Sequence, residues 1–105
     1  MSDVLMDETW DDCVDDALNE RNRAVAKHGW DNTPLGSSSP AIKLAILTEE
    51  VGEVARWVCE RELGNRPDYA NLYDELTQVA AVALMWAENV KQAAHDNAER
   101  VRRGE

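Results

Sequence analysis

The sequence predicts an all-α domain: a helical hairpin preceded by an N-terminal helix. Apolar residues recur at steps of three and four along most of the chain, which is the period of an amphipathic helix. No segment alternates apolar and polar residues as a half-buried strand does. Breaks rich in glycine and proline separate three such stretches, and 105 residues suffice for one small domain spanning 1–105.

The first helix is predicted from about Glu8 to Lys27, after a polar start at 1–7 that is expected to fray. Trp10 and Val14 begin its apolar stripe, and its acidic residues precede its basic ones. That order suits the helix dipole, which favours negative charge at the start of a helix and positive charge at its end.

The second helix is predicted from Pro40 to Leu63. Ser39 is a suitable N-cap, and proline is favoured at the first helical position because it has no N–H to leave unpaired. The segment 64–67, Gly-Asn-Arg-Pro, is expected to end this helix because neither glycine nor proline suits a helix interior.

The third helix is predicted from the N-cap Asp68 to about Val101, and the charged residues 102–105 are expected to fray. The second and third helices each carry an apolar seam with coiled-coil spacing, and the short break makes them antiparallel. The seams are Leu44, Leu47, Val51, Val54 and Val58, and Leu72, Leu76, Val79, Ala83, Trp86 and Val90. We expect two such hairpins to form a four-helix bundle on dimerisation.

The composition limits the partners. A formal net charge of −10 argues against binding to nucleic acid polymers and to anionic membrane surfaces, which need clustered lysine and arginine. Cys13 and Cys59 are isolated and have no metal-type spacing, so reduced thiols in the cytoplasm are expected. A small anionic ligand would need a metal ion to bridge it to so acidic a chain.

Two acidic clusters are the candidate functional site. Helix geometry directs Glu50 and Glu53 to one flank of the second helix, and Glu75 and Gln78 to the matching flank of the third. Glu49 falls on the far side, towards water. Side-chain oxygens from two facing helices could form the hard, all-oxygen cage that Mg²⁺ prefers.

Apolar residues share these flanks and form a side stripe, made up of Ile46, Trp57, Val82 and Trp86. So apolar a stripe is expected to need a cover, and we expect a homodimer or homotetramer to provide it. Charges on such a stripe are costly unless they are paired or bound to a cation. The alternative is that the acids are solvated, or neutralised in salt bridges with Lys43 or Arg61.

The two acidic stretches resemble the MazG-like branch of the all-α nucleoside triphosphate pyrophosphohydrolases. The pattern of that family is Glu-Glu-x-x-Glu, a spacer, and then Glu-x-x-Asp. Residues 43–55 and 74–83 carry the resemblance here, and the loop at 27–34 is similar in kind to a Trp-Gly loop of the family. The resemblance covers about residues 20–90.

The resemblance implies a set of metal ligands and a reaction. The ligands would be Glu50, Glu53 and Glu75, with Gln78 where the family usually has Asp. Water would attack an NTP or dNTP between the α and β phosphates, releasing NMP and pyrophosphate, with Mg²⁺ or Mn²⁺ as cofactor. Glu49 or a ligand such as Glu50 would orient the water. An amide oxygen can coordinate Mg²⁺ but carries no charge, so Gln78 would weaken metal binding or remove one metal site.

Two further residues are candidate substrate contacts. Lys43 lies two turns before Glu50 on nearly the same side, so it is either a phosphate contact or a solvated lysine. Trp30 either stacks on a base or caps a helix end. Two other functions stay open: a non-catalytic nucleotide-binding protein of the same fold, and a helical protein–protein interaction module whose acids are solvated.

Overall fold

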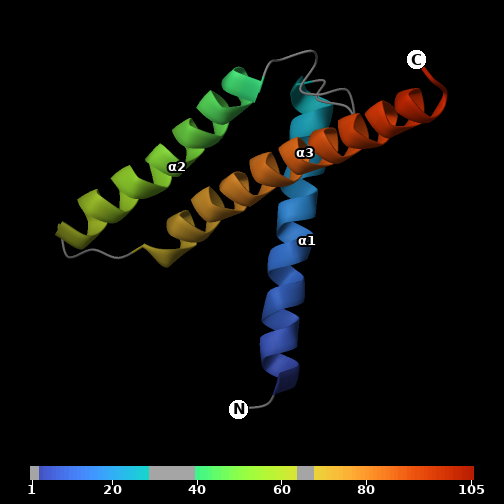
Figure 1. Ribbon diagram of the computed structural model, residues 1–105. Coiled ribbons are helices and arrows are strands. Elements are labelled where there is room, and N and C mark those ends of the chain that lie inside the picture. Colours follow the sequence, from blue (N-terminus) through green and yellow to red (C-terminus); the bar gives the residue numbers. More distant parts are fainter. Residues whose placement is uncertain (1–2, 29–39, 64–67) are drawn as a thin grey trace.

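A computed structural model describes residues 3–28, 40–63 and 68–105 of the chain. Three helices fill these ranges, α1 (Asp3–His28), α2 (Pro40–Leu63) and α3 (Tyr69–Arg102), and no strand occurs within them (Figure 1). The predicted all-α class is therefore confirmed. The predicted breaks, including Trp30, lie outside the described residues.

The helix ends follow the local signals closely. The bounds of α2 are those predicted, and α3 begins directly after Asp68, whose side chain accepts a hydrogen bond from the backbone N–H of Asn71 at 3.3 Å. The first helix starts earlier than predicted: α1 begins at Asp3 rather than at about Glu8, so residues 3–7 are helical. Acidic residues are frequent in that stretch, and negative charge stabilises the start of a helix.

The third helix is the centre of the molecule. It packs against α2 as an antiparallel neighbour and against α1, which crosses it (Figure 1). Within the described ranges, α1 and α2 do not pack against each other. Because α3 packs against both α1 and α2, the rotation of α3 about its own axis decides which of its side chains are buried.

The buried core is small and lies on the side of α3 that faces its neighbours. Ala81, Val82 and Met85 of α3 are buried with Ala17 of α1. By contrast, much of the predicted seams is open to solvent: the exposed members include Leu44, Val51, Leu76 and Val90, with Leu76 48% and Val90 55% exposed. The seams are therefore covered only in part: no seam residue is fully buried, and the half-buried ones are Leu47, Val54, Val58, Leu72, Val79 and Trp86.

The side stripe that was expected to need a partner is instead covered largely within the chain. Val82 is buried, and Ile46, Trp57 and Trp86 are half-buried. Ile46 and Val82 line one hollow together, so the α2–α3 contact runs through this stripe. The stripe therefore gives no reason of its own for self-association.

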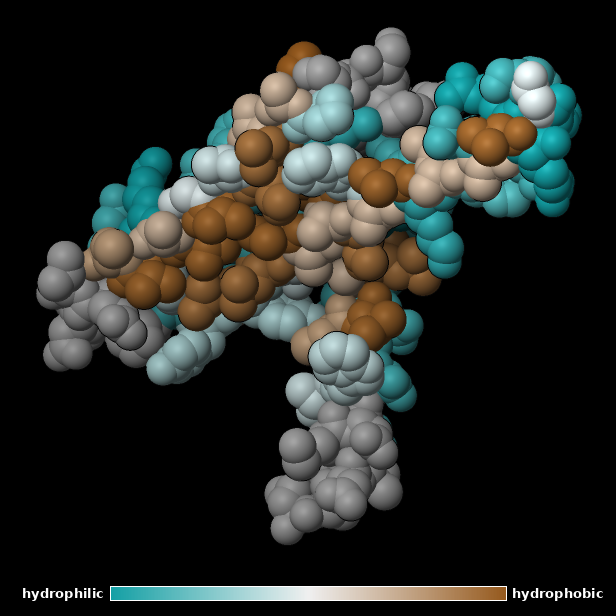
Figure 2. All heavy atoms as spheres, viewed as in Figure 1, coloured by the Kyte–Doolittle hydropathy of each residue, from teal (hydrophilic) through white to brown (hydrophobic). Residues whose placement is uncertain are grey.

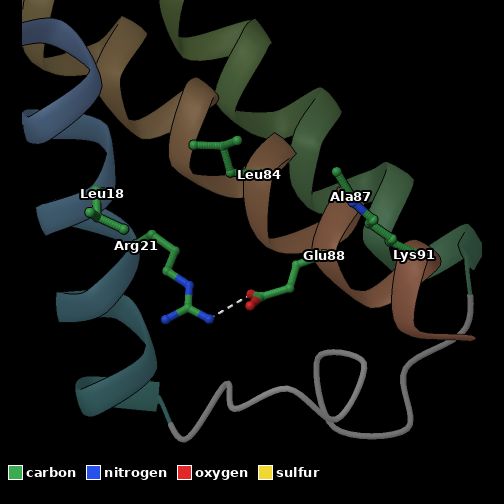
Figure 3. Close-up of a pocket in the computed structure, with 6 residues that line it drawn as sticks. All are labelled: Leu18, Arg21, Leu84, Ala87, Glu88 and Lys91. Atoms are coloured by element: carbon green, nitrogen blue, oxygen red, sulfur yellow. Dashed lines mark hydrogen bonds and ion pairs between the residues drawn. The ribbon is translucent and has the colours of Figure 1, made fainter. Parts of the chain in front are cut away.

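Polar contacts tie α1 to α3. The Arg21 guanidinium pairs with the Glu88 carboxylate at 2.5 Å, beside Leu18 and Leu84 (Figure 3). The Tyr73 hydroxyl donates to Asp16 Oδ2 at 2.5 Å, and this hydrogen bond is the main reason why the pKa of Tyr73 is raised. Both contacts span the crossing of the two helices. Among the described residues, no helix has the length and apolar character needed to cross a membrane.

Candidate functional site

A small cavity of about 150 Å³ lies where the three helices come together, and it contains part of the predicted site. Its lining combines acids, one amide and apolar side chains: Glu20 and Ala24 from α1, Ile46 and Glu50 from α2, and Gln78, Ala81, Val82 and Met85 from α3. The structure thus brings Glu50 and Gln78 together, as the matching flanks of the two helices predicted.

Glu50 is the electrostatic centre of this site. Its carboxyl group is half-buried, and its pKa is raised, first by burial and then by the negative charges of Glu75, Glu49, Glu53 and Glu20. Burial disfavours the charged form, and each like charge nearby disfavours it further. A carboxylate in this position is therefore destabilised at neutral pH, and a bound cation would relieve that.

The other predicted acids surround Glu50 but differ in exposure. Glu75 of α3 is half-buried, whereas Glu49 and Glu53 of α2 are exposed. The expectation that Glu49 faces water is confirmed. The sequence placed Glu53 on the same flank of the second helix as the apolar side stripe. In the structure the Glu53 side chain is exposed to solvent.

The donor set suits a hard divalent cation. Carboxylate and amide oxygens are the ligands that Mg²⁺ takes in proteins, and Glu50, Glu53, Glu75 and Gln78 each have a side-chain oxygen to offer. Among the side chains that the structure describes, no three of the His, Cys, Asp and Glu type converge closely enough to share one ion. The chemistry of the residues therefore fits Mg²⁺, and coordination would need the carboxylates to turn towards one another.

Glu20 of α1 is the site residue that sequence reasoning missed. It lines the same cavity as Glu50 and Gln78, and both of its carboxylate oxygens accept hydrogen bonds from Arg23, at 2.6 and 2.9 Å. A signal was present in the sequence: Glu20 follows the buried Ala17 by three residues and therefore lies on the same side of α1. No periodicity within α1 could say which other helix that side faces.

Lys43 is buried, with 5% of its surface exposed, so the prediction of a solvated lysine was wrong. Lys43 precedes Ile46 by one helical turn, and Ile46 lines the cavity that contains Glu50. Asn89 of α3 is buried as well. Lys43 thus lies buried near the start of α2, two turns from Glu50.

Trp57 carries a second buried polar group in α2. Its Nε1 atom is buried and has no hydrogen-bond acceptor within the described part of the chain. Trp57 follows Glu53 by one helical turn, so this free donor lies on the same flank as the acids.

Comparisons with protein-family models, with curated proteins and with solved structures found no match to this chain.

Proposed function

We propose that the protein is a Mg²⁺-dependent nucleotide pyrophosphohydrolase that cleaves an NTP or dNTP to NMP and pyrophosphate. The observation that carries the proposal is Glu50, a half-buried carboxyl group whose pKa is raised first by burial and then by four neighbouring acids. A divalent cation is the simplest way to stabilise such a cluster in its charged form. The resemblance of residues 43–55 and 74–83 to the MazG-like family adds the phosphate chemistry.

Each residue has a defined part in this proposal. Glu50, Glu53, Glu75 and Gln78 would hold Mg²⁺, or Mn²⁺ in its place. The ion would neutralise phosphate charge and lower the pKa of water. Glu49 is exposed beside the ligands, where it would orient the attacking water. Lys43 is buried, so it would contact a phosphate only if its side chain turned outwards.

The test is pyrophosphate release from a panel of NTPs and dNTPs with Mg²⁺. Wild-type protein should release NMP and pyrophosphate, and Glu50→Gln should lower turnover by more than about 100-fold, since loss of an outer-shell partner alone costs 10–100-fold. Glu60→Gln is the matched control: Glu60 is also on α2, but it is exposed, lies outside the cavity and pairs with Arg56. Absence of turnover by wild type on the whole panel would overturn the proposal.

A second candidate is a nucleotide-binding protein without hydrolytic activity. Gln78 favours it, because the cavity holds a neutral amide at the position where the family has a charged Asp. Gln78→Asp should tighten Mg²⁺ binding about tenfold, since a carboxylate binds this cation better than an amide does. Calorimetry with Mg²⁺, and pyrophosphate release by both proteins, separate the candidates. Nucleotide uptake without release by wild type would favour binding alone.

A third candidate, a helical interaction module, has a separate observation in its favour: large apolar side chains are exposed on all three helices. We also propose that the chain assembles as a homodimer or homotetramer, with two α2–α3 hairpins in a four-helix bundle. What supports assembly is not the side stripe but the exposure of the predicted seams.

A further inference from the structure

The middle of α3 is apolar on two sides. Its inner side is buried against α1 and α2, while the opposite side carries a second apolar row, here named the outer face of α3. The outer face consists of Leu76, Ala80, Ala83, Ala87, Val90 and Ala94, at steps of four and three throughout. A helix that is apolar all round is normally buried all round. Steps of four and three are also the spacing by which one helix packs along another in a coiled coil.

Two hollows flank the outer face. One of about 570 Å³ lies between α1 and α3 and includes Trp10, Val14 and Leu84; the other, of about 430 Å³, lies between α2 and α3 and includes Leu47. Ala83 and Ala87 line both hollows, so the outer face is a ridge of small side chains between two apolar grooves. Figure 2 shows the resulting apolar surface running without interruption along the middle of the molecule.

The chain exposes more surface than is typical of a compact monomer of its mass. The chain exposes 7814 Å², whereas a folded monomer of 11.8 kDa is expected to expose about 5,900 Å². The surplus of about 1,900 Å² exceeds the roughly 800 Å² that each partner buries in a standard interface. The radius of gyration agrees, at 17.3 Å against about 13 Å expected for this length. The missing burial is of the size that a partner chain supplies.

Charge restricts where a second copy can dock. Each chain has a net charge of −10, so two copies repel one another. The repulsion is weakest where the two apposed surfaces carry no charged side chains. The outer face is such a place, because none of its six residues is ionisable. The Arg21–Glu88 pair and Lys91 stand beside it, at the edge of an adjoining hollow (Figure 3). An apolar centre with a polar rim is the usual anatomy of a protein interface.

We propose that the outer face of α3 binds the outer face of a second copy, with the two helices antiparallel and crossing at Ala83. Leu76 and Val90 lie two turns on either side of Ala83, so the crossing sets Leu76 of one copy beside Val90 of the other. A two-fold axis requires this kind of self-complementarity. Small side chains at the crossing let the two helices approach closely, and the flanking grooves receive the larger side chains.

The test is the mass in solution, measured by light scattering without nucleotide or metal. Wild type should have twice 11.8 kDa, or a higher even multiple, at micromolar concentration. Ala83→Glu should raise the dissociation constant at least about 100-fold, because it would bury an unpaired charge at the crossing. Ala45→Glu is the matched control, because Ala45 is also an exposed helical alanine but lies on α2 and outside the hollows. The Ala45→Glu protein should have the same mass in solution as wild type.

Three results would overturn this proposal. If wild type is monomeric, a second copy does not bind the outer face, and its partner is a different protein or an apolar ligand. Association retained by Ala83→Glu would place the contact elsewhere. Equal dissociation by Ala45→Glu would mean that added charge alone separates the chains. Circular dichroism should show the same helix content in all three proteins. Since no nucleotide is present, failure here leaves the proposed hydrolase activity untouched, and absence of turnover leaves this proposal untouched.

Discussion

The inner and outer sides of α3 both have helical apolar spacing, but only the inner side is buried. The inner side buries Val82 and Met85 and brings Gln78 to the acidic cavity. The outer side has the more regular apolar spacing, yet its large residues Leu76 and Val90 remain about half exposed. Regular spacing therefore marks where a helix can pack, and the buried side is chosen by the neighbours that the chain itself supplies.

The comparison also explains where the candidate site lies. Carboxylates on a fully exposed helix face stay hydrated, and their mutual repulsion is weak. On the inner side, three helices partly dehydrate Glu50 and hold other acids near it. The outer side has no ionisable group in the row that defines it. The molecule thus separates a polar, chemically capable side of α3 from an apolar side suited to association.

The largest expected difference between the two sides is in stability. Met85 is 3% exposed, so Met85→Ala should lower the free energy of unfolding by about 2–4 kcal/mol through lost burial and the cavity left behind. This loss should not depend on protein concentration. Leu76→Ala, on the outer face, should instead produce a loss that grows with concentration, because it acts on association. Urea unfolding at several protein concentrations measures both, and a concentration-independent effect of Leu76→Ala would contradict the distinction.

A smaller effect is expected from pH at Glu50. Because its pKa is raised in the folded chain, the folded state binds more protons than the unfolded state between the usual pKa and the raised one. The contribution of Glu50 to the free energy of unfolding therefore falls as pH rises through that window and stays low above it. Glu50→Gln should raise the urea midpoint at pH 7 and leave it unchanged at pH 4.

The exposed neighbour Glu49 provides the control for this measurement, since Glu49→Gln removes a charge outside the cavity. It should shift the midpoint at pH 7 less than Glu50→Gln does. Added Mg²⁺ should raise the midpoint of wild type more than that of Glu50→Gln, because an ion that binds only the folded state stabilises it. Equal midpoints for the two variants at pH 7 would remove Glu50 from the centre of the site.

The smallest effect is expected at the Arg21–Glu88 ion pair, which joins α1 to α3 beside the outer face. Both side chains are partly exposed, so solvent screens the pair and it should contribute only about 0.2–1 kcal/mol. A double-mutant cycle with Arg21→Ala and Glu88→Ala isolates that coupling. A coupling of several kcal/mol would mean that the α1–α3 crossing depends on this pair rather than on burial.

The sequence by itself determined the helices and part of the site. The bounds of α2 and the cap at Asp68 were predictable because capping and helix-breaking act over a few neighbouring residues. The meeting of Glu50 and Gln78 was predictable too, since a short connection makes two helices antiparallel and a fixed turn angle sets their flanks. These are local or nearly local properties of the chain.

The tertiary structure alone decided which apolar row of α3 is buried, and with it the place of Glu20 and the burial of Lys43. Both rows of α3 satisfy a helical period, so periodicity could not choose between them. The choice depends on α1, which packs across the same side of α3 as α2 and brings Glu20 with it. Contacts between distant segments carry no local signal, because they follow from the burial of the whole chain rather than from the preferences of neighbouring residues.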